Sequence, residues 1–317
     1  MIATISPSRP SLRRMTDIPS RRALLGMIGA TLTLSPVARA LAAVHPAVPT
    51  IVAVKTAGGR ISNVTHWRAP VRRGTILFSH GALSSPAKYD PLILPWVAAG
   101  FDVWAPLHVD STDHPDTKAF PGLASWRARI EDMRALSAHV GGNGHIAAGH
   151  SYGGLTALTL GGARAVVPDG VTGSLRDSRT RAVVAFSPPG LAPGLIDGPG
   201  YAGLAVPAFI QTGDKDLPPG PPSTVIDPDA WKKHLLAYDS AAPGGSRYAL
   251  ILDGVDHYFG GLICSPERPG PRQTLQLQQA VALSRLFLQG YGSGSASARA
   301  SLDAALIETG PVILRRK

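Results

Sequence analysis

The segment that most constrains the fold is a serine flanked by glycines between two apolar stretches. Residues 149–153 (GHSYG) follow the apolar run 145–148 and precede the small-residue stretch 154–160. Glycine two residues before and two after a serine suits a sharp strand-to-helix turn, because a Cβ at either position would clash with the adjacent strand or helix. Such a turn pushes the serine hydroxyl out of the sheet. The pattern therefore predicts a nucleophile elbow at Ser151, provided that an acid and a base follow in the chain.

Short apolar runs alternate with helical patterns along most of the chain. The runs that predict strands are 75–78, 101–105, 145–148, 182–186, 206–211 and 248–252, and the predicted helices are 92–99, 126–140, 154–160, 229–238 and 274–288. Wholly apolar strands separated by helices indicate a parallel sheet covered on both faces. Residues 51–55 and 61–67 predict an antiparallel hairpin at its edge. Segment 187–205 is too short for a helical cap, so we expect an α/β fold with no large cap domain.

The composition indicates one large globular domain. The chain has 317 residues, of which 44% are hydrophobic and 16% charged, which is enough for a sizeable core. Cys264 is the only cysteine. An intramolecular disulfide and a thiolate metal cluster are therefore both excluded.

The N-terminus resembles a twin-arginine export signal. Arg21 and Arg22 follow a basic stretch and precede an uncharged segment, 23–38, which is too short and too interrupted by glycine and proline to span a bilayer stably. Small residues around Ala40 predict cleavage after Ala40 or Ala42. We expect the twin-arginine machinery as a partner and a periplasmic or extracellular mature protein. The alternative is a basic tail on a cytoplasmic enzyme.

We expect three parts: an export signal at 1–40, a main domain at 41–290, and a flexible linker with a C-terminal tail at 291–317. Loss of the first part removes six arginines and one aspartate, which lowers the net charge of +10 by five. The remaining charge lacks the basic-aromatic pattern of nucleic-acid binding. In the tail, a Gly/Ser-rich run precedes a short helical pattern that Ser301 could cap and that Gly310-Pro311 would end. A docked helix and a disordered extension both remain open.

Candidate partners for Ser151 lie after two later strands. A serine hydroxyl needs an imidazole to take its proton and a carboxylate to orient that imidazole. Asp214 and Asp216 follow the strand at 206–211, and His257 follows the strand at 248–252. These are strand C-termini, where open α/β sheets place their sites. His257 is the candidate base, because no other histidine follows a strand downstream of the acid, and either aspartate could be the acid.

We expect no catalytic role for three other groups of polar residues. His150 is expected to neighbour the site, and His234, within a helical pattern, is expected at the surface. A loop cluster could hold a divalent cation, but nothing in its pattern fixes the ligand directions, so a polar substrate-side loop is favoured. That cluster is His108, Asp110, Asp113, His114 and Asp116.

The motifs resemble those of the α/β-hydrolases, and more narrowly the group of serine esterases that includes dienelactone hydrolase and platelet-activating-factor acetylhydrolase. The matching segments are 78–82 (FSHGA), the elbow, 213–216 (GDKD) and 256–259 (DHYF). The resemblance covers most of the main domain and implies an α/β-hydrolase fold. It also implies Asp216 as the acid, in preference to Asp214. The implied oxyanion donors are the amides of Ala82 and Tyr152, with Leu83 as the alternative to Ala82.

This resemblance implies a carboxylic ester hydrolase that forms an acyl-enzyme on Ser151 and needs no cofactor or metal. A small-molecule or lipid-like ester is the expected substrate. Two alternatives remain: an acyltransferase that passes the same acyl group to an alcohol, and a non-catalytic binding protein on a hydrolase scaffold. The intact set of Ser151, Asp216 and His257 argues against the second.

Overall fold

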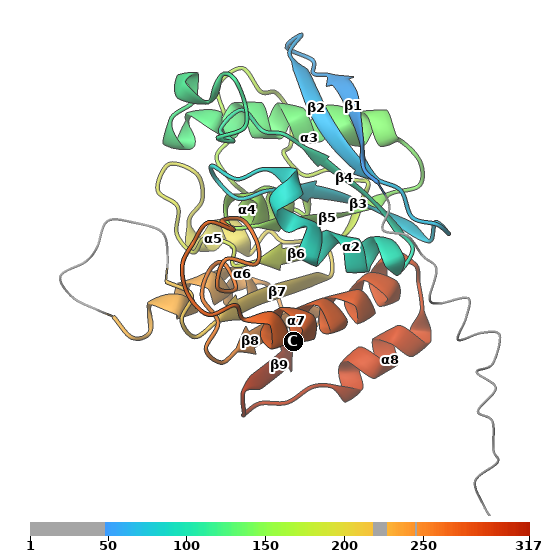
Figure 1. Ribbon diagram of the computed structural model, residues 1–317, viewed down its shortest axis with the longest axis vertical. Coiled ribbons are helices and arrows are strands. Elements are labelled where there is room, and N and C mark those ends of the chain that lie inside the picture. Colours follow the sequence, from blue (N-terminus) through green and yellow to red (C-terminus); the bar gives the residue numbers. More distant parts are fainter. Residues whose placement is uncertain (1–47, 218–226, 245) are drawn as a thin grey trace, which may run out of the picture. The chain divides into compact units, whose positions relative to one another are not determined.

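A computed structural model describes residues 48–217, 227–244 and 246–317. The expected export signal and its cleavage site lie outside these residues. The described chain forms a nine-stranded sheet in the order β1-β2-β4-β3-β5-β6-β7-β8-β9 (Figure 1). The strands are β1 (Thr50–Lys55), β2 (Ile61–Trp67), β3 (Gly74–Ser79), β4 (Phe101–Pro106), β5 (His145–His150), β6 (Thr180–Phe186), β7 (Ala208–Gly213), β8 (Arg247–Leu252) and β9 (Val312–Arg316).

Helices connect the strands, as the alternating pattern predicts. The α-helices are α2 (Asp90–Ala98), α3 (Trp126–Val140), α4 (Tyr152–Leu160), α5 (Gly198–Tyr201), α6 (Leu236–Ser240), α7 (Thr274–Phe287) and α8 (Ala296–Ala304). Shorter 3-10 turns are η2 (Pro86–Tyr89), η3 (Thr117–Ala119), η4 (Gly122–Ser125) and η5 (Ala230–Leu235), and η6 (Leu288–Gly292) is a π-helical turn. The helix expected at 229–238 is thus η5 followed by α6. No helix in the described part of the chain is long and apolar enough to cross a membrane.

The sheet is parallel from β4 to β8 and is buried on both faces. Alternate residues of β3 supply different cores: Ile76 and Phe78 pack into one, and Leu77 into the other. Residues of α2, α7 and α8 complete the first core, and residues of α3 and α4 complete the second (Figure 1). Strands β1 and β2 form the expected antiparallel hairpin, which joins β4. The expected mostly parallel α/β architecture is confirmed, and only the four-residue α5 interrupts the connection from β6 to β7.

The C-terminal segment differs from the expected flexible linker and tail. Helix α8 begins at Ala296, and the Ser295 side chain accepts a hydrogen bond from the Ala298 amide at 3.2 Å, so Ser301 is not its cap. Strand β9 pairs antiparallel with β8, with Leu250 opposite Leu314. Because β8 would otherwise end the sheet with unpaired backbone groups, this pairing covers its edge. Residues 291–317 therefore belong to the same sheet and core as the main domain.

The packing of β9 on the core leads to a prediction about the stability of the protein. Leu314 is fully buried in the core beneath β9, whereas Leu306 is 39% exposed. We expect Leu314→Ala to lower the free energy of unfolding by about 2–5 kcal/mol, because it removes core contacts and leaves a cavity. The control Leu306→Ala should change it by about 0.5 kcal/mol or less. Urea unfolding measures both, and equal effects would contradict the docking of β9.

Candidate active site

Ser151 occupies the sharp turn between β5 and α4 that its glycines predict. Its φ is 54°, in the left-handed region that residues other than glycine rarely adopt. A Cβ on Gly153 would overlap the carbonyl oxygen of Ser79 in β3, and a Cβ on Gly149 would overlap the backbone of Gly153. These two positions therefore require glycine for α4 to pack against β3 and β5. The turn leaves Ser151 partly exposed at the C-terminal end of the sheet.

Asp216 and His257 form a hydrogen-bonded pair at the same end of the sheet. Asp216 follows β7 and His257 follows β8, and Nδ1 of His257 donates to Asp216 Oδ1 at 2.7 Å. The hydroxyl of Thr212 donates to Asp216 Oδ2 at 2.8 Å. The opposite ring nitrogen of His257, Nε2, has no hydrogen-bond partner among the described residues. The imidazole is thus oriented by the acid and keeps one nitrogen free.

Ser151 and His257 line one cavity of about 620 Å³. The other described residues that line it are Ser187, Pro189, Gly190, Leu191, Pro193, Asp229, Lys232, Lys233, His234, Leu236 and Asp239. Its lining is therefore partly polar, while prolines and leucines supply an apolar wall.

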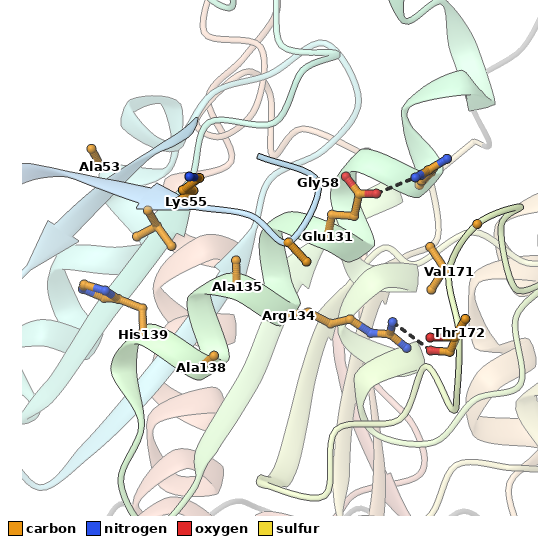
Figure 2. Close-up of a pocket in the computed structure, with 14 residues that line it drawn as sticks. Ala53, Lys55, Gly58, Glu131, Arg134, Ala135, Ala138, His139, Val171 and Thr172 are labelled. Atoms are coloured by element: carbon orange, nitrogen blue, oxygen red, sulfur yellow. Dashed lines mark hydrogen bonds and ion pairs between the residues drawn. The ribbon is translucent and has the colours of Figure 1, made fainter. Parts of the chain in front are cut away.

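A second hollow, of about 740 Å³, lies between β1, α3 and residues 170–172 (Figure 2). Figure 2 shows Arg134 of α3 directed at Thr172, to whose carbonyl it donates at 3.1 Å. Among the described residues that line this hollow, no serine or cysteine accompanies His139. Nucleophilic chemistry is therefore better placed in the cavity at Ser151.

Asp214, the alternative acid, is placed elsewhere. Its carboxylate accepts from Lys215 Nζ at 2.8 Å and from the Gly254 amide at 2.7 Å. These contacts fix the turn after β7 against the turn after β8. The structure thus pairs His257 with Asp216 and gives Asp214 a role in that turn.

His150 lies beside the site, within a buried chain of hydrogen bonds. The Gly81 amide donates to the Tyr89 hydroxyl at 2.9 Å, and that hydroxyl lies 2.9 Å from His150 Nδ1. His150 Nε2 lies 2.8 Å from the His257 carbonyl, which can only accept, so Nε2 carries the proton and Tyr89 donates to Nδ1. Burial lowers the pKa of His150 to about 4, which keeps this neutral form. The chain ties the loop at Gly81 to the backbone of the candidate base.

His234 does not lie at the surface, so that expectation is wrong. Its side chain is 1% exposed, and its Nε2 lies 3.1 Å from Asp216 Oδ1 as an ion-pair contact. Its Nδ1 lies 2.7 Å from the Pro188 carbonyl oxygen. The 3-10 turn η5 directs the ring inward at a position where the helical pattern suggested an outward face.

Asp216, His234 and His257 are the described residues whose ligand-type atoms cluster closely enough to suggest a cation, all within 4.8 Å of one another. The Asp216 oxygen and the His257 nitrogen are 2.7 Å apart. Two ligands of one tetrahedral ion would stand about 3.3 Å apart. We therefore interpret the cluster as one carboxylate hydrogen-bonded and ion-paired to imidazoles.

The pKa shifts in this cluster follow from burial and charge. Burial alone would raise the pKa of Asp216, but contacts with His234 and His257 hold it well below its usual value, so the carboxylate is ionised. Burial lowers the pKa of His257, Asp216 opposes this, and His150 and His234 add to the lowering. His257 is therefore neutral and able to accept a proton near neutral pH.

The loop after β3 is anchored by the buried side chain of Arg129. The guanidinium donates to the carbonyl oxygens of His80 at 2.8 Å and Gly81 at 3.3 Å, and it pairs with both carboxylate oxygens of Asp110. His80 Nδ1 also lies 2.7 Å from the Gly81 carbonyl. Because C=O and N–H point in opposite directions across a trans peptide, an inward Gly81 carbonyl turns the Ala82 amide outward. This anchoring favours Ala82 over Leu83 as an anion-binding donor.

Tyr152 offers the second such amide at the start of α4. The Ser151 carbonyl accepts from the Leu155 amide at 3.2 Å along the helix. The Tyr152 amide therefore points the opposite way, out of the helix N-terminus, where N–H groups have no intrahelical partner. Its ring stacks on Trp126 and lies under the Arg129 guanidinium, 4.4 Å from the ring centroid. Arg129 thus contacts both segments that supply the two amides.

The polar side chains of the loop at 108–116 do not form a cation site. His108 Nε2 lies 2.9 Å from the Ser79 hydroxyl and Nδ1 lies 2.8 Å from Asp132, while Asp110 is taken by Arg129. Ser79, His108 and Asp132 form a second Ser-His-Asp chain, but all three are fully buried. That chain is inaccessible to a substrate and ties β3 to α3.

No sequence pattern singled out Arg129, which looks like an ordinary polar residue in a helix, or Tyr89. His234 is a histidine and so a recognisable candidate for a functional site, but the helical pattern around it predicted a solvent-exposed side chain. These residues act through partners between 8 and about 60 positions away, so only the folded chain brings them together.

No protein-family model matches the chain, and no curated protein sequence matches it. Solved structures do match. Thermogutta terrifontis esterase 2 has a TM-score of 0.55 at 16% identity over 77% of this chain and 93% of that one. Dienelactone hydrolase from Anabaena variabilis has a TM-score of 0.54 at 16% identity over 78% and 100%. A puromycin-hydrolyzing peptidase from Mycobacterium tuberculosis has 0.52 at 14% over 78% and 40%.

These similarities, together with the observed sheet, establish that the chain has the α/β-hydrolase fold. The expected fold class is confirmed. At such identities the likeness concerns the fold alone, and the three similar proteins are an esterase, a dienelactone hydrolase and a peptidase.

The buried contacts of Arg129 lead to a stability prediction, for which Arg127 on the same helix is the control. Arg129→Met leaves the Asp110 carboxylate buried without its partner, so we expect the free energy of unfolding to fall by about 3–5 kcal/mol. Arg127 forms an exposed ion pair with Glu131, and Arg127→Met should cost about 0.5 kcal/mol or less. Urea denaturation compares the two, and a similar small loss for both would contradict the anchoring role.

Proposed function

We propose that the protein is a serine hydrolase that cleaves carboxylic esters through an acyl-enzyme on Ser151. The observation that carries the proposal is the hydrogen-bonded pair of Asp216 and His257. His257 keeps Nε2 without a partner among the described residues, and it lines the same cavity as Ser151, whose φ is positive. A base oriented by a buried acid beside a serine is the arrangement that activates a hydroxyl for acyl transfer.

In the first half of the reaction, His257 Nε2 takes the proton of the Ser151 hydroxyl while Oγ attacks the ester carbonyl carbon. The carbonyl oxygen becomes an oxyanion, which the amides of Ala82 and Tyr152 stabilise. The tetrahedral intermediate then breaks its bond to the alkoxy oxygen. His257 gives its proton to that oxygen, and the alcohol leaves.

In the second half, His257 takes a proton from water as the water oxygen attacks the acyl carbon. Collapse of the second tetrahedral intermediate breaks the bond to Ser151 Oγ, and His257 returns the proton to the serine. Asp216 stays ionised throughout and holds the imidazole through Nδ1. The acid product leaves and the starting state is restored.

The cavity supports a substrate with a compact apolar portion. Pro189, Leu191 and Leu236 belong to the apolar wall of the cavity that Ser151 also lines. Apolar walls with a few convergent polar groups are typical of small-molecule sites. We propose a small or lipid-like ester, with its apolar part against this wall.

We also propose that the chain is exported by the twin-arginine route and acts in the periplasm or outside the cell. Support comes from the arginine pair and the apolar segment after it, which lie outside the described residues. Intact mass of the exported protein tests this: loss of 40 or 42 residues is expected, and full length in the cytoplasm would contradict it.

The proposed function predicts which substitutions abolish turnover. Ser151→Ala, Asp216→Asn and His257→Gln should each lower kcat for p-nitrophenyl esters by about 10³-fold or more, because each removes a member of one proton-transfer unit. Asp214→Asn should stay within about threefold of the unmodified enzyme, since it leaves that unit intact. Initial rates over a panel of acyl chain lengths measure this.

Circular dichroism on each variant checks that it is folded. Undiminished turnover of Ser151→Ala would refute the mechanism. Equal losses from Asp214→Asn and Asp216→Asn would overturn the choice of acid.

A further inference from the structure

His234 is a buried histidine that the proposed reaction does not use. It lies in η5, and its ring centroid is 5.6 Å from that of His257. Its two ring nitrogens contact different parts of the site. Nε2 lies 3.1 Å from Asp216 Oδ1, and Nδ1 lies 2.7 Å from the Pro188 carbonyl oxygen.

The partners fix the protonation of this ring. A backbone carbonyl oxygen can only accept a hydrogen bond, so Nδ1 of His234 carries a proton. Nε2 makes no aligned hydrogen bond among the described residues, but it lies 3.1 Å from the Oδ1 atom of the ionised Asp216 carboxylate. A negative charge at that distance favours a second proton on the ring. An imidazole with both nitrogens protonated is a cation. The two contacts therefore favour the imidazolium form of His234, beside the carboxylate that also orients His257.

The surrounding charges agree with this state. Burial would lower the pKa of His234, but Asp216 and the Pro188 carbonyl overcome it and raise the pKa above its usual value. His257 and His150 are the other titratable groups close enough to feel this charge, and it lowers the pKa of both. On the same element, Lys232 is paired with Asp229 at 2.9 Å, and Lys233 is exposed to solvent.

His234 also fixes the cavity wall. Its hydrogen bond holds the carbonyl of Pro188, the residue before the wall segment 189–191. A Cβ on Gly190 would come within 2.6 Å of the Lys233 carbonyl oxygen, so the wall packs directly on η5. The acid and the wall are thus joined through one side chain.

We propose that His234 is a positioning residue that stays cationic, shares the Asp216 carboxylate with His257 and so sets the basicity of His257. This inference rests on the proposed function, because it assigns His234 a part in the same site. When His257 takes the serine proton, two imidazolium rings share one carboxylate. The charge on His234 therefore weakens His257 as a base and keeps it unprotonated to lower pH.

The test is the pH dependence of kcat/KM for a p-nitrophenyl ester, because its acid limb reports the pKa of the base in the free enzyme. His234→Gln removes the positive charge, so the imidazolium form of His257 becomes more favourable. We expect the acid limb to move to higher pH by about 0.5 to 2 units, the range for a unit charge at this ring separation between water-like and protein-like screening. A merely structural role would lower kcat without moving the limb.

His139→Gln is the matched control, since His139 is exposed on α3 and packs against Trp104. The acid limb of the kcat/KM profile of His139→Gln should coincide with that of the unmodified enzyme. An acid limb in His234→Gln that stays in place or moves to lower pH would overturn the inference while leaving ester hydrolysis intact. Absence of hydrolysis by the unmodified enzyme would instead refute the proposed function.

A second measurement needs no variant. Nitrogen-15 spectra of the histidine rings at about pH 8 should show His234 with both ring nitrogens protonated and His257 neutral. A neutral His234 tautomer at that pH would overturn the inference, whatever the activity of the protein.

Discussion

The rest of the site depends on one steric constraint, the close approach of the turn at Ser151 to strand β3. The backbone at Gly153 lies so near the Ser79 carbonyl that no Cβ fits between them. That approach requires β3 and β5 to be adjacent and parallel, with α4 starting directly at the strand end. It also forces Ser151 into a positive φ. The strain is sustained because the strands on both sides are fully buried and cannot shift without losing core contacts.

Two buried hydrogen-bond systems extend from this turn and reach the remaining functional groups. Arg129 holds the carbonyls of the loop after β3 inward, which turns the Ala82 amide outward. Tyr89 and His150 connect the same loop to the backbone of His257. Each buried carbonyl and amide in these systems finds a partner, which removes the cost of burying it. The loop after β3 and the backbone of His257 are therefore joined by one continuous buried polar network.

The sequence predicted what depends on short-range pattern. Apolar strands and glycine spacing predicted the turn at Ser151. The strand ends pointed to His257 and to either Asp214 or Asp216, because parallel strands bring their C-termini to one edge, and only the family resemblance implied Asp216. The sequence did not predict the inward direction of His234, since a 3-10 turn and an ion pair with a residue from another strand decide it. For 291–317 it predicted a flexible linker and left the tail open between a docked helix and a disordered extension. Gly/Ser composition hides the cap at Ser295, and the partner of Leu314 in β9 is 64 residues away at Leu250. Long-range pairing is invisible to local periodicity.

The most direct test of this account is mass spectrometry of the protein after reaction with a fluorophosphonate, followed by peptide mapping. A serine activated by His257 attacks phosphorus, displaces fluoride and keeps the phosphonyl group. The account predicts one adduct per chain, on Ser151, with none on Ser187, which lines the same cavity and also has a positive φ of 46°. An unlabelled folded protein, or an adduct on Ser187, would contradict it.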